Sequence, residues 1–352
     1  MKEKAKEVLT DLVLLKSTSE DDSRPIVDYV TARLKKLGLK PKYYGSKEHP
    51  AIIAPFRKGG VALSGHLDTV PHGTGWMHED GEFEDWRLYG RGACDMKGGC
   101  TAMLLAAEEM VAANVPFVLC FTTDEETTMI GAGAAAKDLG LRKAPAIVVT
   151  EPTGFEIVIK EKGLLHFAIR TNGVSAHASM PHLGDNAITK MTDLLAKTKD
   201  LQRIPKNPTD VMTMSVDTIK GGTRINVIPD ECEVEVDVRY PPNMNTKSVL
   251  KLLRDRMGRD GYEIKVLHEL DPVGTDARSP AVKALRNVIG PKAKVTAVPY
   301  ATEMVMFKDA NKVLMVCGPG ESEICHCNDE WVDIREIAKA VDIYSEYCAR
   351  MA

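Results

Sequence analysis

The sequence predicts an α/β fold: a mostly parallel sheet covered by helices, into which an α+β domain with an antiparallel sheet is inserted. Two patterns predict this fold. Continuous apolar runs at 61–65, 116–123 and 146–151 alternate with helical segments, as in a sheet covered on both faces. From about residue 163, apolar and polar residues alternate along longer runs, which indicates a sheet with one solvated face.

The individual elements follow from the same spacing. In the first domain, helices are expected near 2–16, 24–37, 96–114, 131–140 and 279–290 and from about 333, with a further strand at 312–318. In the inserted domain, strands are expected at 164–171, 211–222 and 231–240, and helices near 184–199 and 246–257. The chain is therefore predicted to form a discontinuous first domain, 1–162 and 272–352, and an inserted domain, 163–271.

Composition narrows the function classes. A net charge of −4 over 352 residues argues against a nucleic-acid partner, which usually meets a basic surface. No apolar stretch approaches the roughly 18 residues that span a membrane, and Asp11 interrupts the apolar positions of the first helix, unlike a signal peptide. The 8 cysteines are scattered without a C-x-x-C pair. We expect a reduced, cytoplasmic protein that binds neither membranes nor nucleic acid.

Histidine and acidic residues follow the predicted strands at the points where these end. They are His66 and Asp68, Asp95, Asp124 to Glu126, Glu151 and His326. Ligands of an open α/β sheet bind outside the carboxyl ends of its strands, so separate segments are expected to bring these side chains to one edge. Each residue alone is more often a solvated loop group or a helix cap. Their shared topological position indicates a metal site.

The residue types also limit the metal. Two imidazoles with several carboxylates suit zinc, cobalt or manganese better than calcium, which prefers oxygen ligands alone. If one carboxylate bridges two ions, the pair can hold a bridging hydroxide and polarise a carbonyl group. His66 is then a ligand and Asp68, two residues on, the carboxylate that orients it; the alternative is a loop with a chance histidine.

Other patterns favour structural roles. Cys325 and Cys327 flank His326 but would point away from its side in an extended segment, so we interpret them as structural. The glycine-rich run at 131–136 has the shape of a dinucleotide fingerprint but does not directly follow a strand, which weakens a dehydrogenase interpretation. His72 and His78 are interpreted as surface or crevice residues, and His166 and His182 stay unassigned. No G-x-S-x-G elbow is present.

Several motifs together resemble the zinc-dependent deacetylase and peptidase family, which includes acetylornithine deacetylase, succinyl-diaminopimelate desuccinylase, aminoacylase and dipeptidases. These motifs are "SGHLDTVP", "GRGACDMKGG", "TTDEE", "TEPT", "GVSAHASMPHLGDNAI", "RINVIPDECEVEVDVRYPP" and "CGPGESEICHCNDEW". The resemblance covers about 60–332 in matching order. It implies a zinc-exopeptidase-like catalytic domain with two metal ions, and an inserted lid domain that often forms a homodimer contact.

The resemblance also implies roles for single residues. One metal would be held by His66 and Glu151 and the other by Glu126 and His326. Asp95 would bridge them, often with a cis peptide bond to the next residue, here Met96. Asp68 would orient His66, and Glu125 would be the general base that takes a proton from the metal-bound water.

Four residues bear on the substrate. By the resemblance, His177 reaches from one subunit to the substrate carbonyl in the other, and Arg239 with Asn226 binds the substrate's α-carboxylate. The alternative for Arg239 is a surface ion pair with Glu235 or Asp237. Glu303 lies in an "ATE" sequence similar to that of acetylornithine deacetylases. If it faces the crevice, its charge favours a cationic side chain; the alternative is a solvated loop carboxylate.

The sequence therefore predicts an enzyme, a dinuclear zinc hydrolase that cleaves the amide of an N-acyl amino acid and is most similar to acetylornithine deacetylase. Cobalt or manganese could replace zinc. The alternatives within the family are a succinyl-diaminopimelate desuccinylase and a di- or tripeptidase. A non-catalytic metal-binding relative is a further alternative, but the presence of Glu125 favours catalysis.

Overall fold

The computed structural model describes residues 1–18, 20–202 and 210–352, which form two compact units. The first unit comprises Met1–Ile159, Thr275–Thr296 and Thr302–Ala352. The second comprises Lys160–Gly274 and Ala297–Ala301, and the predicted inserted domain, 163–271, falls within it.

The larger sheet has nine strands in the order β1-β2-β6-β3-β7-β15-β8-β13, with β14 paired to β8. Its strands are β1 (Lys42–Gly45), β2 (Pro50–Phe56), β3 (Val61–His66), β6 (Phe117–Thr122), β7 (Ile147–Val149), β8 (Ile157–Glu161), β13 (Val273–Gly274), β14 (Val295–Val298) and β15 (Leu314–Val316). The central pairs β6–β3, β3–β7 and β7–β15 are parallel, and the pairs β1–β2, β2–β6, β15–β8 and β8–β13 are antiparallel. The carboxyl ends of β3, β6, β7 and β15 therefore meet at one edge.

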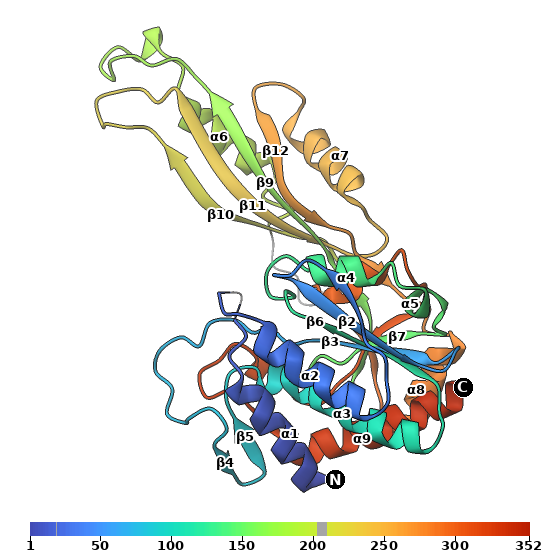
Figure 1. Ribbon diagram of the computed structural model, residues 1–352. Helices are drawn as coiled ribbons and strands as arrows, with labels where there is room; N and C mark the ends of the chain where they lie inside the picture. Colours follow the sequence, from blue (N-terminus) through green and yellow to red (C-terminus); the bar gives the residue numbers. More distant parts are fainter. Residues whose placement is uncertain (19, 203–209) are drawn as a thin grey trace. The chain divides into compact units, whose positions relative to one another are not determined.

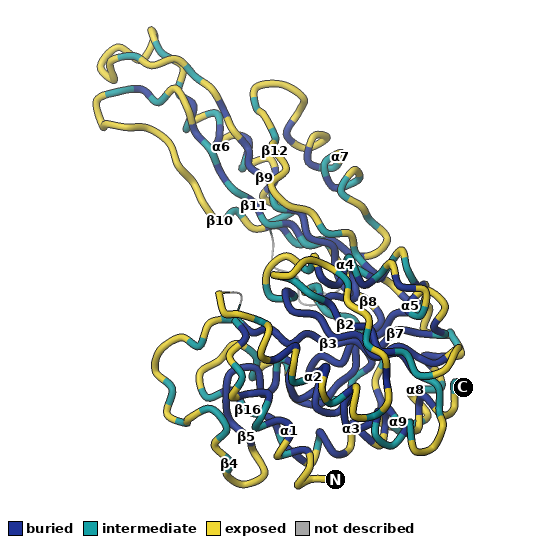
Figure 2. The backbone as a smooth tube through the Cα atoms, viewed as in Figure 1, coloured by how far each residue is buried: buried dark blue, intermediate teal, exposed yellow. Residues whose placement is uncertain are grey.

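Helices cover both faces of this sheet (Figure 1). On one face lie α1 (Lys2–Leu14), α2 (Arg24–Lys36), α3 (Gly98–Ala112), α8 (Pro280–Ile289) and α9 (Ile334–Met351); on the other lie α4 (Ile130–Ala135) and α5 (Leu139–Lys143). The central strands are buried along their length, as Figure 2 shows. Buried strands that contact helices on both faces of the sheet are typical of a parallel α/β core. The predicted α/β architecture is confirmed.

Some elements differ from the sequence prediction. The single helix expected at 131–140 is two short ones, because Asp138 caps the second: its carboxylate accepts a hydrogen bond from the Gly140 N–H at 2.6 Å. Strands β1, β2, β8, β13 and β14 and the strand β12 (Glu263–Leu270) escaped prediction, as did a small sheet of β4 (Phe83–Glu84), β5 (Arg87–Tyr89) and β16 (Trp331–Asp333). The strands of two or three residues among them are too short to show a periodic pattern.

The second unit has a four-stranded antiparallel sheet in the order β10-β11-β9-β12. Its elements are β9 (Gly163–Asn172), β10 (Thr213–Gly221), β11 (Glu231–Tyr240), β12 (Glu263–Leu270), α6 (Ala187–Lys197) and α7 (Thr246–Met257). Along β11, buried Cys232, Val234, Val236 and Val238 alternate with partly exposed residues. One sheet face packs with α6 and α7 in a hydrophobic core, and the other carries polar side chains.

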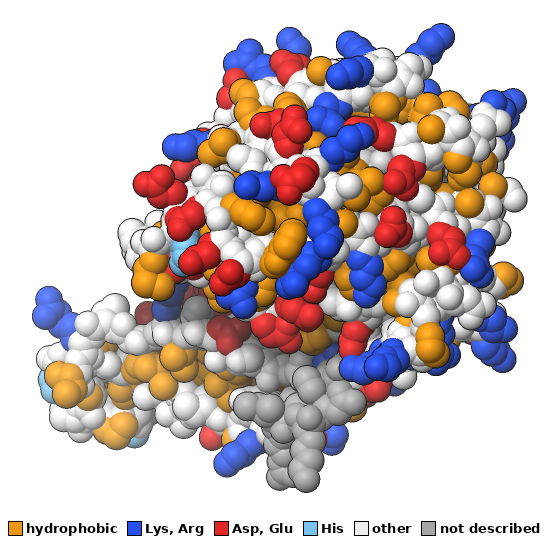
Figure 3. All heavy atoms as spheres, turned by 90° about the horizontal axis from the view of Figure 1, so that it is seen from below, with side chains coloured by type: hydrophobic (Ala, Val, Ile, Leu, Met, Phe, Trp, Pro, Cys, Tyr) orange, Lys and Arg blue, Asp and Glu red, His pale blue; other side chains and the backbone are white. Residues whose placement is uncertain are grey.

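Short helical turns complete the chain: η1 (Ala93–Lys97), η2 (Pro181–Leu183), η3 (Glu303–Phe307) and η4 (Ser322–Ile324). Basic and acidic side chains are interspersed on the molecular face that Figure 3 shows. Within the described residues, the helices are too short or too polar to cross a membrane.

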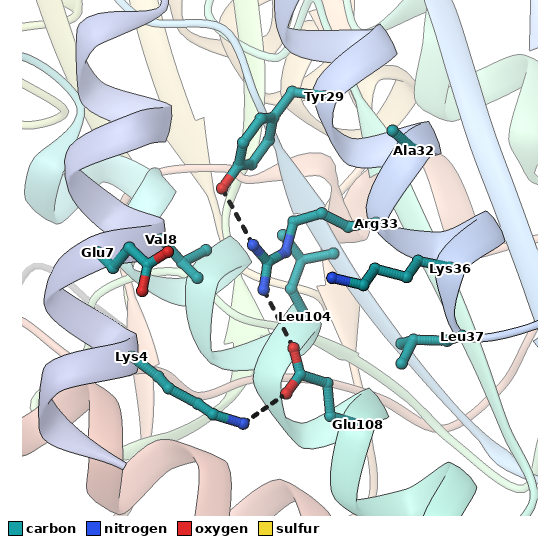
Figure 4. Close-up of a pocket in the computed structure, with 10 residues that line it drawn as sticks. All are labelled: Lys4, Glu7, Val8, Tyr29, Ala32, Arg33, Lys36, Leu37, Leu104 and Glu108. Carbon is teal, nitrogen blue, oxygen red and sulfur yellow. Dashed lines mark hydrogen bonds and ion pairs between the residues drawn. The ribbon is translucent and has the colours of Figure 1, made fainter.

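A cavity of about 580 Å³ is lined by side chains of α1, α2 and α3. Glu108 on α3 accepts hydrogen bonds there from Arg33 at 3.0 Å and from Lys4 at 3.1 Å (Figure 4). Arg33 also donates to the Tyr29 hydroxyl at 3.3 Å. Because these charged groups pair with one another, we interpret them as links between the three helices.

Candidate metal centre and active site

The sheet edge brings together the side chains that the sequence singled out in the first unit. His66 is the last residue of β3, Glu125 and Glu126 follow β6, and Glu151 follows β7. Asp95 lies in η1, just before α3, and His326 lies in the loop after β15. The parallel register pairs His66 with Thr122, so the turn that carries the two glutamates begins beside this histidine.

One candidate ligand group consists of His66, Asp95 and Glu151. The His66 Nε2 lies 3.1 Å from Asp95 Oδ1 and 3.3 Å from Glu151 Oε1. The other ring nitrogen, Nδ1, donates a hydrogen bond to the Asp68 carbonyl oxygen at 2.9 Å. Nε2 is therefore left facing two carboxylate oxygens, and a cation, either a proton or a metal ion, is required between them.

The second candidate group consists of Asp95, Glu126 and His326. The His326 Nε2 lies 3.0 Å from Glu126 Oε1 and 3.3 Å from Asp95 Oδ2. Asp95 thus directs one oxygen toward each histidine, which is the arrangement of a bridging ligand. The His326 side chain is 51% exposed, whereas that of His66 is 1% exposed, so the His326 group lies nearer to solvent.

These distances fit metal coordination. Two ligand atoms about 2.0–2.2 Å from one tetrahedral ion are about 3.3–3.6 Å apart, and the four spacings above are close to this range. The peptide bond between Asp95 and Met96 is cis, as the resemblance implies. The predicted ligand set His66, Asp95, Glu126, Glu151 and His326 thus forms two adjacent groups that share Asp95, and these residues fit a pair of divalent metal ions.

Asp68 contacts the backbone of two glutamates as well as the His66 ring. Its Oδ1 lies 3.5 Å from His66 Nδ1, farther than the carbonyl oxygen of the same residue. Its two carboxylate oxygens accept hydrogen bonds from the backbone N–H groups of Glu125 at 3.2 Å and Glu126 at 3.0 Å. Asp68 therefore fixes the backbone of the two glutamates relative to His66, which adds to the orienting role expected for it.

Glu330 supports the candidate site through its hydrogen bonds, and sequence reasoning missed it. Its buried carboxylate accepts hydrogen bonds from the backbone N–H groups of Cys94 and Asp95, both at 2.9 Å, and of Gly92 at 3.1 Å. Arg91 donates a fourth at 2.8 Å. Glu330 thus fixes the loop that presents Asp95, the residue that the two candidate ligand groups share. An acidic residue four positions after His326 was the only signal, and it does not reveal its partner 235 positions away.

The carboxylates at this edge repel one another. Burial, together with the charge of Asp95, raises the pKa of Glu151 to about 8. Burial opposes ionisation of Asp95, yet hydrogen bonds from His326 and His66 hold its pKa well below the usual range. Hydrogen bonds to Asp95 and Glu126 raise the pKa of His326 to about 10. The group thus carries more negative charge than the protein compensates, as expected where divalent cations bind.

Glu125 is placed apart from the two ligand pairs yet beside them. Its side chain is half-buried, and its carboxylate can join a group with His66 and Glu126 whose ligand atoms all lie within 4.8 Å of one another. Burial is the main cause that raises its pKa well above the usual value, and the nearby carboxylates Glu151 and Glu126 add to it. A carboxylate that readily accepts a proton suits a general base.

Glu303 lies elsewhere than either sequence interpretation expects. It is 0% exposed at the start of η3, so the interpretation as a solvated loop carboxylate is wrong. Its two oxygens accept hydrogen bonds from Ser64 on β3 and from Thr122 on β6, the latter at 2.6 Å. The carboxylate therefore joins two strand ends that lead into the metal site.

The remaining predicted residues lie in the second unit. His177 and Asn226 are exposed and neighbouring: His177 forms a backbone bridge with Val227, and the Ala178 N–H donates to the Asn226 carbonyl at 3.0 Å. The Ser179 N–H donates to His177 Nδ1 at 3.1 Å, so the neutral ring carries its hydrogen on Nε2. Arg239 forms the ion pair with Asp237 that the sequence left open, at 2.9 Å.

The cysteines beside His326 bind backbone rather than the candidate metal groups. Cys325 Sγ lies 3.8 Å from the Glu321 carbonyl oxygen, and Cys327 Sγ lies 3.5 Å from that of Glu323. The candidate metal-ligand groups found among the described residues contain only histidines and carboxylates. His72 pairs with Asp80 and His78 with Asp329, away from these groups.

Replacing Glu330 with alanine should lower metal affinity about 10- to 100-fold, because Asp95 loses the carboxylate that fixes its loop. Competition with a chelator, followed by metal analysis, measures the change. Asp329→Ala is the matched control, because Asp329 accepts hydrogen bonds from Met77 and His78 rather than from the Asp95 loop. Equal metal loss in both variants would show that Glu330 does not act through Asp95.

Solved structures resemble the whole chain. Aminopeptidase PepT from Bacillus cereus superposes with a TM-score of 0.80 at 18% identity, covering 100% of this chain and 99% of that one. The YXEP protein of Bacillus subtilis, described as a dinuclear metal binding peptidase, superposes with a TM-score of 0.74 at 15% identity, covering 99% and 98%. At these identities the likeness shows the fold.

Curated relatives are closer in sequence. An acetylornithine deacetylase of Myxococcus xanthus is 29% identical over 356 residues, covering 94% of this chain and 93% of the relative. A LysW-lysine/LysW-ornithine hydrolase of Sulfurisphaera tokodaii is 30% identical over 345 residues, covering 97% and 94%. A probable succinyl-diaminopimelate desuccinylase of Staphylococcus epidermidis is 26% identical over 390 residues, covering 96% and 95%.

The family described as Peptidase family M20/M25/M40 matches residues 62–350, the span that contains every candidate metal ligand. The predicted family resemblance is thereby confirmed, as is the prediction of a hydrolase that acts on amides. Because this match spans most of the chain, the chain belongs to Peptidase family M20/M25/M40.

Proposed function

We propose that this protein is a two-metal hydrolase that cleaves the amide bond of an N-acyl amino acid and releases the free amino acid. The observation that supports it best is the placement of Asp95, whose two oxygens lie 3.1 Å and 3.3 Å from histidines of separate ligand groups, with Glu125 nearby. We propose zinc as the metal, with cobalt or manganese as substitutes, because imidazole and carboxylate ligands suit all three.

Divalent metal ions bound there would polarise the amide carbonyl and make water acidic near neutral pH. In this proposal Glu125 takes the proton from the attacking water and delivers it to the leaving amine nitrogen. The backbone N–H of Glu125 is fixed by Asp68, so its carboxylate has a defined position relative to His66. A retained base at this position supports catalysis over a non-catalytic metal-binding role.

We propose that His177 helps to stabilise the negative charge that develops on the amide oxygen. The support is its tautomer: Nδ1 accepts from the Ser179 backbone, so Nε2–H is available as a donor on an exposed ring. By the family resemblance, His177 acts on the active site of the other subunit in a homodimer formed through the second unit.

The substrate is proposed to be Nα-acetylornithine or a close analogue. Arg239, with Asn226, is proposed to bind the α-carboxylate; Asp237 already accepts from Arg239 Nε and Nη2, which leaves Nη1 as the donor for the substrate. Two relatives support ornithine, since the names of both, acetylornithine deacetylase and LysW-lysine/LysW-ornithine hydrolase, contain it. The second name favours a further candidate, release of lysine or ornithine from a LysW conjugate.

Glu303 is proposed to favour a cationic side chain in the substrate. The Glu303 carboxylate is buried and accepts hydrogen bonds from Ser64 and Thr122, so it would not contact the substrate directly. Its influence on the substrate would act through its electrostatic field or through the positions of the two strand ends.

Replacing Glu125 with glutamine should lower kcat by about 10²- to 10⁴-fold, because it removes the proton acceptor and leaves both ligand groups intact. Metal content, measured beside activity, should remain near that of the unmodified protein. Glu126→Ala is the contrasting variant, because it removes a ligand. Equal metal depletion in the two variants would contradict the separate roles.

Mixing the inactive His177→Ala and Glu125→Gln proteins should restore part of the activity. In a mixed dimer, one of the two sites keeps both its own Glu125 and a partner His177. Subunit exchange is verified with differently tagged chains, and recovery is compared with that in each protein alone. If verified mixed dimers stay inactive, His177 does not act across subunits.

The unmodified enzyme should hydrolyse Nα-acetylornithine faster than succinyl-diaminopimelate or a tripeptide in a panel assayed with zinc and with cobalt. Arg239→Ala should lower kcat/KM about 10- to 100-fold, as expected for a lost charged hydrogen bond. Glu303→Gln should reduce the preference for acetylornithine over acetylnorvaline, its uncharged counterpart. Faster turnover of succinyl-diaminopimelate would refute the substrate proposal, and no amine release at all would refute the hydrolase proposal.

A further inference from the structure

Lys162 is a buried cation without a hydrogen-bond partner. The residue lies between β8 and β9 in the second unit and is 1% exposed. Within the described chain, its Nζ is one of the few buried side-chain nitrogen or oxygen atoms that lack a partner. An ammonium group shielded from water without hydrogen bonds is costly for a folded protein, and a bound anionic group is one way to offset that cost.

The strand register places Lys162 close to Arg239. In the antiparallel pair of β9 and β11, Leu164 is opposite Arg239 and His166 is opposite Asp237. Residues directly opposite point to one face, and alternate residues along a strand do the same. Lys162 lies two positions before Leu164, just beyond the paired part of β9, and is close enough to Arg239 for the two like charges to interact.

The charged groups around Arg239 are already paired. Arg239 donates from Nε to Asp237 Oδ1 at 2.9 Å and from Nη2 to Oδ2 at 2.9 Å. His166 Nε2 lies 2.8 Å from the same carboxylate. Burial, followed by the like charge of Arg239, lowers the pKa of Lys162, and the exposed Asp210 opposes this shift only in part. Lys162 therefore lacks a paired carboxylate among the described residues, whereas the nearby Arg239 is paired with Asp237.

We propose that Lys162 and Arg239 together form a binding site for a carboxylate group of the substrate. A carboxylate can accept from the Lys162 ammonium and from Arg239 Nη1 at once, which satisfies the buried amine and compensates its charge. The inference rests on the proposed function, since it adds a second cation to the group that binds the acyl amino acid. The carboxylate comes either from the amino acid itself or from a dicarboxylic acyl group such as succinyl.

Binding to metal-loaded Glu125→Gln protein, measured by calorimetry, tests this site without turnover. We expect Lys162→Met to weaken the binding of Nα-acetylornithine about 10- to 100-fold, the usual size of a charged hydrogen bond, and Lys162→Arg to retain most of it. Binding of the corresponding carboxamide should change less than about 2-fold. If instead only N-succinyl compounds lose affinity relative to N-acetyl ones, the carboxylate is that of the acyl group.

Lys160→Met is the matched control, because Lys160 is two residues away and exposed. It should leave both affinities unchanged. The melting temperature of Lys162→Met should equal or exceed that of the unmodified protein, because an unpaired buried charge is removed. A lower melting temperature, a failure to fold, or an equal loss of affinity for carboxylate and carboxamide would each overturn the proposal and make Lys162 a structural residue.

Ligand binding, measured apart from hydrolysis, distinguishes a failure of the Lys162 site from a failure of the proposed reaction. If the unmodified enzyme hydrolyses none of the panel but still binds N-acetylglycine in a manner sensitive to Lys162→Met, the carboxylate site stands and the proposed reaction does not. If acetylornithine is hydrolysed and Lys162→Met has no effect on its binding, the reaction stands and the site does not.

Discussion

Repulsion among carboxylates is the constraint around which the end of the central sheet is built. Asp68, Asp95, Glu125, Glu126 and Glu151 meet there with only two imidazoles between them. Two such charges 4 Å apart repel by about 4 kcal/mol even with the moderate screening found near a protein surface. The sheet holds these carboxylates close together at rigid strand ends. Backbone N–H groups and bound metal ions can offset their negative charge.

Two carboxylates that are not candidate metal ligands, those of Glu330 and Asp68, hold the neighbouring backbone in place. Glu330 collects three backbone N–H groups and Arg91, and Asp68 collects two more N–H groups. Glu330 and Asp68 therefore each hold the backbone of a loop that carries candidate metal ligands, rather than contacting only the side chain of a ligand. Loops are otherwise the mobile parts of an α/β fold, and the proposed bridging role would require Asp95 to keep one orientation.

The sequence predicts a large part of this arrangement because the central strands and long helices are strongly patterned. Runs such as 61–65 and 116–123 end one or two residues before an acidic or histidine side chain, and a parallel sheet must align those ends. What escaped prediction depends on long-range contacts. Glu330 acts 235 positions from Asp95, and burial of Glu303 requires η3 to pack against β3 and β6. Lys162 follows no periodic signal, since its lack of a partner is a property of the folded chain.

The position of β15 has a consequence for the order in which the protein is completed during synthesis. This strand lies between β7 and β8, although more than 150 residues, including nearly all of the second unit, separate it from them in the chain. His66, Asp95 and Glu151 leave the ribosome early, but the sheet that aligns them stays split until Leu314–Val316 arrives, and His326 follows ten residues later. The nascent chain must therefore hold an open sheet edge and an incomplete cluster of acidic side chains while a whole second unit folds. A chain truncated before Leu314 would lack the closing strand and His326 together, and with them one of the two candidate ligand groups.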